Sequence, residues 1–183
     1  MARLNVHGVT LECLQGDIAH QPDMEAIVNA ANADLRIGGG VAGAIHRAAG
    51  PGLERECRPL APIRPGQAVI TDAHNLPNRH VIHCLGPVFG ADEPSEELLA
   101  SCYRNALRLA ERNKIASIAF PAISTGAFGY PMEPAARVAF KTVIDALPRL
   151  SSVKHIRFVL FRDADVLVHE GVIEELVGSD DAE

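Results

Sequence analysis

Hydrophobic positions along the chain form short apolar runs that alternate with longer segments in which apolar residues are three or four positions apart. Apolar runs of about 4–8 residues are typical of buried strands. We expect two short strands in LNVHGVTLECLQ, on either side of His7 and Gly8. Further strands are expected in AIVNAAN, QAVITDA, HVIHCLG, SIAFP and HIRFVLF.

The longer segments predict amphipathic helices. From residue 40 onward, apolar side chains recur at helical spacing until Gly50 and Pro51, which together form a stop signal. Further helices are expected over residues 96–113, 131–147 and 163–177. In residues 96–113 the acidic side chains come first and basic ones come last, as the helix dipole favours.

Strands that alternate with helices predict an α/β fold with a largely parallel inner sheet. The antiparallel pair at the start of the chain makes that sheet mixed. The sequence contains neither an internal repeat nor a linker long enough to separate two domains. We therefore expect a single domain over residues 1–177 and a solvated C-terminal tail over residues 178–183.

Composition narrows the class of protein. With 183 residues, 48% hydrophobic and 22% charged, the chain is typical of one soluble domain. No apolar run approaches the roughly 18 residues of a membrane span, and MARLNVHGVT lacks a signal-peptide core. We expect a cytoplasmic protein without membrane contact, and a monomer by default. The net charge of −6 argues against a broad grip on nucleic acid, but backbone amides can still bind a small anion.

The cysteines and histidines do not predict a metal site. The four cysteines are far apart and form no C-x-x-C pair, so we expect reduced, buried thiols. His80 and His83 lie three positions apart in a strand, which places them on opposite faces. We therefore expect neither a metal nor a cofactor.

Two glycine-rich loops each follow a predicted strand and precede a predicted helix. The first contains residues 38–40 and the second contains residues 124–129. Each loop by itself fits a tight turn. Because ligands of open α/β sheets bind beyond the carboxyl ends of the strands, the pair of loops favours a phosphate site between them. Neither G-K-[ST] nor G-x-G-x-x-G is present, so a Walker A loop and a dinucleotide fingerprint are not indicated.

Five motifs carry a resemblance to a known family. They are GDI (residues 16–18), IVNAAN (27–32), GGGVAGAIHRAAG (38–50), VIHCLGP (81–87) and PAISTGAFGYP (121–131). Their order and spacing resemble the macrodomain family over roughly residues 9–170. The resemblance implies a three-layer α/β/α domain with a mixed, largely parallel central sheet that binds ADP-ribose.

The resemblance also implies roles for individual residues. Asp17 would accept a hydrogen bond from the adenine amino group beside the Ile18 amide, and Phe161 would lie against the adenine. Asn32 would bind the distal ribose hydroxyls and Phe128 would cover that ribose. Backbone groups that cradle the diphosphate would come from Gly39, Gly40, Val41, Ser124, Thr125, Gly126 and Ala127.

Alternative interpretations remain open at several of these positions. Asp17 could cap a turn, and Phe161 could belong to the core. We expect Asn29 to be structural rather than ligand-binding, because turn asparagines commonly bond to their own loop backbone.

The reaction is less well defined than the ligand. Members of the related hydrolase branch usually carry an aspartate where this chain has Ala42, and a glycine where it has Ile37. Alanine cannot accept a proton, so this route of base catalysis is absent. The first glycine loop also resembles those of viral and archaeal macrodomains regarded as hydrolases without that aspartate. In those proteins a water between the ligand's phosphate and the distal ribose is the proposed nucleophile.

Three residues are therefore candidates for the catalytic site. Asn32 would orient the sugar and Phe128 would shape the space around the reacting carbon. His46 could act as an acid or base, or could simply be packed against a carbonyl.

We hypothesise that the protein binds ADP-ribose and hydrolyses an ester-linked form of it, on an ADP-ribosylated protein or on O-acetyl-ADP-ribose. The alternative is a non-catalytic reader of ADP-ribose or ADP-ribosylated proteins. Binding to RNA or a polymer has less support from the acidic composition.

Overall fold

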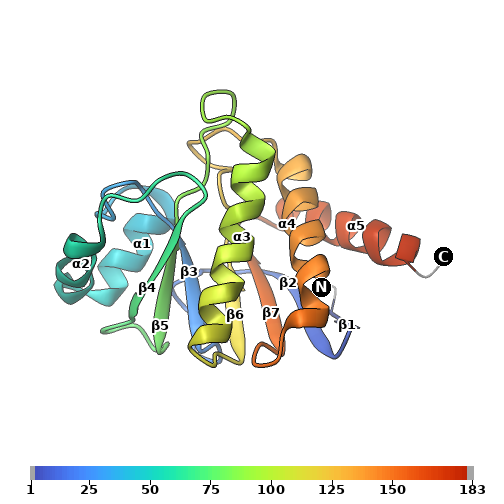
Figure 1. Cartoon of the computed structure of the whole chain (residues 1–183), viewed down its shortest axis with the longest axis horizontal. Coiled ribbons are helices and arrows are strands. Elements are labelled where there is room, and N and C mark those ends of the chain that lie inside the picture. Colours follow the sequence, from blue (N-terminus) through green and yellow to red (C-terminus); the bar gives the residue numbers. More distant parts are fainter. Residues whose placement is uncertain (1–2, 181–183) are drawn as a thin grey trace.

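The computed structural model describes residues 3–180. Within this range the chain forms one seven-stranded sheet and five α-helices (Figure 1). The strands are β1 (Arg3–Val6), β2 (Val9–Gln15), β3 (Ala26–Ala30), β4 (Ala68–Asp72), β5 (His80–Cys84), β6 (Ser117–Phe120) and β7 (His155–Leu160). The helices are α1 (Gly40–Ala49), α2 (Pro51–Cys57), α3 (Ser95–Arg112), α4 (Met132–Ala146) and α5 (Asp163–Asp180).

The strand order is β1-β2-β7-β6-β3-β5-β4. The five inner strands are parallel, whereas β1 and β4 pair antiparallel at the two edges. The mixed, largely parallel sheet predicted from the sequence is confirmed. The second antiparallel edge was not predicted, because the connection between β4 and β5 carries no two-residue hairpin turn.

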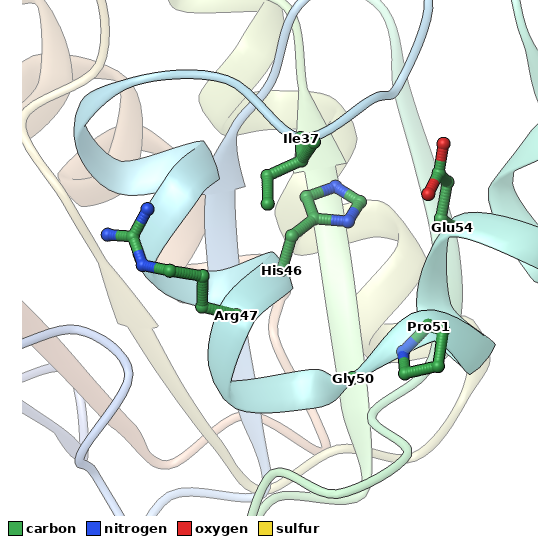
Figure 2. A pocket seen from close by; sticks show the side chains of 6 residues that line it. All are labelled: Ile37, His46, Arg47, Gly50, Pro51 and Glu54. Carbon is green, nitrogen blue, oxygen red and sulfur yellow. The ribbon is translucent and has the colours of Figure 1, made fainter.

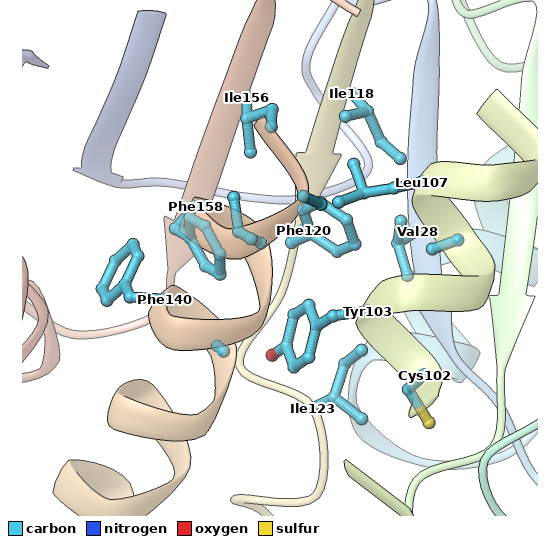
Figure 3. Close-up of a cluster of buried hydrophobic side chains, with 14 of the residues drawn as sticks. Val28, Cys102, Tyr103, Leu107, Ile118, Phe120, Ile123, Phe140, Ile156 and Phe158 are labelled. Atoms are coloured by element: carbon cyan, nitrogen blue, oxygen red, sulfur yellow. The ribbon is translucent and has the colours of Figure 1, made fainter. Parts of the chain in front are cut away.

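Helices cover both faces of the sheet, which gives the predicted three layers. On one face α3, α4 and α5 enclose a core that contains an aromatic group (Figure 3). In that group the Phe120 and Phe158 rings stack with centroids 5.5 Å apart, and Tyr103 and Phe140 pack beside them. On the other face α1 and α2 enclose a second cluster that includes Ile18, Leu35 and Ile45.

Two helix boundaries differ from the prediction. Helix α1 ends at Gly50 as expected, but Pro51 immediately begins α2, which was not predicted. Gly50 makes this possible with a φ of +81°, and Pro51 suits the first position of a helix. Helix α5 continues to Asp180, so the first residues of the predicted tail are helical, whereas residues 181–183 lie outside the described range.

The four cysteines are buried and free, as expected. Burial raises the pKa of Cys13 to about 12 and that of Cys57 to about 11, so both thiols remain protonated at neutral pH. None of the helices within residues 3–180 is both long enough and apolar enough to span a bilayer.

Candidate functional site

Four neighbouring parallel strands place the predicted ligand-binding segments side by side. In the sheet, β2, β7, β6 and β3 are consecutive, and their carboxyl ends lie at one edge (Figure 1). Asp17 follows β2, Phe161 follows β7, the second glycine loop follows β6, and Asn32 with the first glycine loop follows β3. The structure therefore brings together segments that are up to about 145 positions apart in the sequence, as the crevice rule for α/β sheets expects.

Asp17 and Phe161 extend from the ends of two paired strands. The Gly16 amide donates to the Leu160 carbonyl at 2.9 Å, which holds the two strand ends together. The Phe161 side chain is 85% exposed, so the alternative that places it in the core is wrong. An exposed aromatic ring beside an exposed carboxylate is a suitable platform for a flat base with an exocyclic amine.

The loop that carries Asp17 is a capped turn. Asp17 Oδ1 accepts a hydrogen bond from the Ala19 amide at 2.9 Å, and Oδ2 lies 3.0 Å from His20 Nδ1. Asp17 thus caps its turn, as the alternative held. The carboxylate is still 53% exposed, and each of its oxygens has more than one lone pair, so capping leaves acceptor capacity for a ligand. Ile18 is buried in the cluster under α1.

A buried arginine fixes this loop to the sheet. Arg157 lies opposite Glu12 in the β2–β7 register and donates to it at 2.7 Å. It also donates to Gln21 Oε1 at 2.8 Å and to both oxygens of Asp23. Gln21 in turn donates to the Asp17 carbonyl at 2.9 Å. Sequence reasoning missed these residues. The signal that could have found them was the presence of Glu12 and Arg157 within two mostly apolar strands, β2 and β7.

The charges of this network are paired in a way that holds the acids ionised. Burial alone would raise the pKa of Glu12, but hydrogen bonds and charge from Arg157 and His155 outweigh burial and lower that pKa. The hydrogen bond from Arg157 likewise lowers the pKa of Asp23. The loop is therefore anchored by a charged network at neutral pH.

Asn32 closes a turn just before the first glycine loop. Its Nδ2 donates to the Arg36 carbonyl at 2.8 Å and its Oδ1 accepts from the Arg36 amide at 2.9 Å. An asparagine amide has two donor hydrogens and two acceptor lone pairs, so one of each remains for a ligand. The side chain is half-buried, and the turn fixes its orientation.

The first glycine loop exposes the start of α1. Gly39 and Gly40 are exposed, and a Cβ added at either would meet no atom within 4 Å. Within the part of the chain that the structure describes, no side chain caps the N-terminus of α1, and the first turn of this helix contains no acidic residue. Its first amides therefore lack helical acceptors and carry the positive end of the dipole, which suits an anion. Val41 begins this turn and packs on the cluster that contains Ile18.

The second glycine loop is held by its own side chains. Ser124 is buried, with a φ of +67°, and its hydroxyl donates to the Pro87 carbonyl at 2.8 Å. The Thr125 hydroxyl donates to the Ala122 carbonyl at 2.7 Å. Among residues 3–180, no backbone carbonyl accepts from the amides of Gly126, Ala127 or Phe128. The loop therefore presents backbone donors rather than hydroxyls.

Phe128 is the residue of the second loop that packs against the core. Its side chain is partly buried against the cluster that includes Ile18 and Ile45. Val41 packs on the same cluster, so both glycine loops border one apolar floor. Backbone donors of both loops therefore lie at the border of the same apolar cluster.

Asn29 and His83 form a buried polar group between the sheet and helices α1 and α2. Asn29 Nδ2 donates to His83 Nδ1 at 3.1 Å, and His83 Nε2 donates to Thr71 Oγ1 at 3.0 Å. Burial and the neighbouring His46 lower the pKa of His83 to about 3, so it is neutral. Asn29 is 1% exposed, which agrees with the structural role expected for it. Its partner, however, is a distant histidine instead of its own loop backbone.

His46 lies on α1 one turn after Ala42, and both side chains are buried. Burial lowers the pKa of His46, opposed in part by the charge of Glu54, so the imidazole is neutral at pH 7. Its Nε2 is buried and has no hydrogen-bond partner among the described residues, so the structure does not show the carbonyl contact considered above. Within residues 3–180, no group of three or more His, Cys, Asp or Glu side chains is placed to hold a metal ion.

Comparisons with known proteins agree with this geometry. Residues 28–139 match the family model described as Macro domain. The O-acetyl-ADP-ribose deacetylase of Cronobacter sakazakii is 45% identical over 168 residues, which cover 89% of this chain and 93% of that protein. The ADP-ribose glycohydrolase MACROD2 of Xenopus laevis is 46% identical over 175 residues, which cover 92% of this chain and 42% of that protein.

Solved structures show the same fold. The macrodomain of Oceanobacillus iheyensis with ADP superposes with a TM-score of 0.93 at 40% identity, over 97% of each chain. The Trypanosoma brucei macrodomain in complex with ADP-ribose superposes with a TM-score of 0.83 at 36% identity, over 89% of this chain and 68% of that one. From the matched family model, the identities and the shared architecture, the chain belongs to the Macro domain family.

Proposed function

We propose that this protein binds ADP-ribose in the crevice between the two glycine loops and hydrolyses an ester bond to it, in an ADP-ribosylated protein or in O-acetyl-ADP-ribose. One observation carries the proposal. The uncapped start of α1 and the unbonded amides of residues 126–128 follow two adjacent parallel strands, β3 and β6. Two sets of donors across one crevice suit a diphosphate, and the relatives' names supply the nucleotide sugar.

The exposed edge of the crevice suits the adenine. Asp17 would accept from the exocyclic amine while its loop stays anchored through Gln21 and Arg157. Phe161 would stack on the base, since its ring is exposed beside the same strand ends. Asn32 would bind the distal ribose at the opposite end of the site, next to the first loop.

The reaction would consume one water for each ester. The water oxygen bonds to the carbonyl carbon of the ester, and the bond between that carbon and the ribose oxygen breaks. The products are a hydroxyl on the ribose and a carboxylate with one released proton. Ala42 cannot take that proton, so we assign its removal to a phosphate oxygen of the ligand itself. Backbone donors would hold that phosphate in place, Asn32 would orient the sugar, and Phe128 would exclude bulk water.

His46 has a different role in this proposal. It is buried, neutral and lies beneath the first loop, so we assign it no proton-transfer step. Its position on α1 supports the backbone of the loop that holds the phosphate.

The deciding experiment incubates the protein with a protein substrate that is ADP-ribosylated on glutamate and follows the release of label. Calorimetry with ADP-ribose runs in parallel, against ADP, AMP and NAD. We expect release well above buffer and selective binding of ADP-ribose. Intact binding without release of label, on this substrate or on O-acetyl-ADP-ribose, would contradict the enzyme and support the alternative, a non-catalytic reader.

We also propose that the protein acts as a monomer. This rests on one compact arrangement of elements around one sheet. Light scattering coupled to size exclusion should give a mass near 19.6 kDa, and a larger mass would contradict the monomer.

A further inference from the structure

An open cavity of about 260 Å³ lies beside the segment that leads into the first glycine loop. It is lined by that segment, by α1 and by α2 (Figure 2). The residues that line it are Ile37, His46, Arg47, Gly50, Pro51 and Glu54. None of them is among the residues that form the proposed crevice for ADP-ribose, apart from the support that His46 gives to the loop.

The inner wall of the cavity holds an unpartnered polar atom. His46 is 5% exposed, and its ring lies between Ile37 and Glu54 in the close view (Figure 2). Its Nε2 is buried without a hydrogen-bond partner among the described residues. A buried polar atom without a partner is costly, and a shift of the ring toward an occupant of the cavity would let the atom form a bond and remove that cost.

The rim combines both charges with apolar surface. Glu54 and Arg47 lie on opposite sides of the His46 ring, and Ile37 is 51% exposed (Figure 2). A free anion would meet the Glu54 carboxylate and a free cation would meet Arg47. A polypeptide offers an amide donor, a carbonyl acceptor and apolar side chains within a few ångströms, which matches this mixture.

The cavity is adjacent to the loop that the proposed function places at the phosphate and the distal ribose. Ile37 directly precedes the first glycine loop, and α1 packs so closely on this loop that a Cβ at Gly43 would collide with the Gly38 carbonyl. The proposed function places Asn32 at the distal ribose, and Asn32 bonds to Arg36, the neighbour of Ile37 in the cavity wall. A chain attached to that ribose would therefore leave the site close to the cavity.

We propose that this cavity binds the acceptor polypeptide of an ADP-ribosylated protein, next to the modified side chain. The inference rests on the proposed function, since it presupposes that ADP-ribose occupies the crevice. It assigns this chain a preference for protein-linked ADP-ribose over a small ester, and it assigns Arg47 and Glu54 to the recognition of the acceptor.

The test compares two substrates that share ADP-ribose but differ in what is attached to it. Steady-state rates are measured on O-acetyl-ADP-ribose and on a glutamate-ADP-ribosylated protein for the parent, for Arg47→Ala and for Glu54→Ala. Each variant should raise KM for the protein substrate about tenfold and leave kcat/KM for O-acetyl-ADP-ribose within about twofold. Glu174→Ala, an exposed acid on α5, is the matched control and should change neither.

Two outcomes would overturn the inference while leaving the proposed function intact. One is an unchanged KM for the protein substrate in both cavity variants. The other is an equal loss on both substrates, which would mean that the substitutions only disturb the loop.

If the parent hydrolyses neither substrate, the proposed reaction fails and binding decides the inference. Calorimetry then compares free ADP-ribose with an ADP-ribosylated peptide. The parent should bind the peptide more tightly, and Arg47→Ala and Glu54→Ala should each remove the difference. Equal affinity of the parent for both ligands would overturn the inference.

Discussion

The two glycine loops follow adjacent parallel strands, β3 and β6, but are built differently. The second loop is held by the buried hydroxyl of Ser124, by the Thr125 hydroxyl and by an amide of Phe89 that donates to the Phe128 carbonyl at 2.9 Å. Among the described residues, no side chain forms a hydrogen bond with the glycines of the first loop. Its glycines are exposed, and its nearest anchor is the turn that Asn32 makes with Arg36.

This difference separates a preformed site from an adaptable one. Ordering a loop on binding costs conformational entropy, whereas a loop already held in place does not incur that cost again. We therefore expect the second loop to contribute most of the affinity for the diphosphate. The first loop should adjust to the ligand. Because this loop is next to the cavity, it would also lie beside the acceptor polypeptide of an ADP-ribosylated protein.

The largest expected effect comes from placing a side chain in each loop. Gly126→Val should weaken ADP-ribose binding at least about 100-fold, whereas Gly39→Val should weaken it only about tenfold. A Cβ at either position meets no protein atom within 4 Å, so the melting temperature should stay nearly constant. Calorimetry and thermal unfolding measure both quantities.

Equal losses in the two valine variants would contradict the difference between the loops. A Gly126→Val protein that binds as well as the parent would show that the second loop does not hold the phosphate.

The second prediction concerns pH and the buried histidines, of which His83 and His46 lie between the sheet and helices α1 and α2. The pKa of His83 is about 3 in the folded protein, against about 6.5 when unfolded, so between these values only the unfolded chain binds the proton. Stability should therefore fall by about 1.4 kcal/mol per pH unit below pH 6.5. The lowered pKa values of His46 and His169 act in the same direction.

Urea unfolding at pH 7 and pH 5 measures this loss, and His83→Gln should reduce the slope. Amide exchange then localises the effect: after correction for intrinsic rates, the hydrogen-bonded amides of residues 43–49 in α1 should lose protection at pH 5 before those of Gly129 and Tyr130 do. Uniform loss would contradict the assignment of the effect to α1.

A smaller effect is expected from the buried hydroxyl of the second loop. Ser124→Ala should lower the free energy of unfolding by about 1–2 kcal/mol, because the Pro87 carbonyl loses its donor. ADP-ribose affinity should fall about fivefold as the loop loosens. Thr142→Ala is a matched control, since Thr142 makes a similar buried bond to the Val138 carbonyl on α4 and should reduce stability alone.

The smallest effect on stability is expected at Asn32. Asn32→Ala removes both bonds to Arg36 and should lower the free energy of unfolding by about 1 kcal/mol. Turnover should fall more than binding, because the ribose loses its orientation. Asn113→Ala removes a comparable bond at the end of α3 and should leave turnover unchanged, whereas an equal loss there would contradict a role at the ribose.

Much of the architecture was predictable from local patterns. The seven strands and four of the five described helices follow from apolar runs and helical spacing, and β3 and β6 lead into the glycine loops as expected. Helix α2 escaped prediction because the Gly50–Pro51 pair, a stop signal for α1, is also an effective start signal for a following helix. The resemblance of five motifs then supplied the ligand, which no pattern of periodicity contains.

The sequence by itself determined the order of the elements, the family and the identity of the two glycine loops, because periodicity and motif spacing are properties of neighbouring residues. The tertiary structure decided which polar groups are committed to the protein itself. Ser124 bonds to a carbonyl 37 positions away, and Arg157 holds a glutamine 136 positions away. Packing determines such partners. Only the folded chain therefore reveals that hydrogen bonds hold the second loop in place, whereas the first loop is exposed beside a cavity.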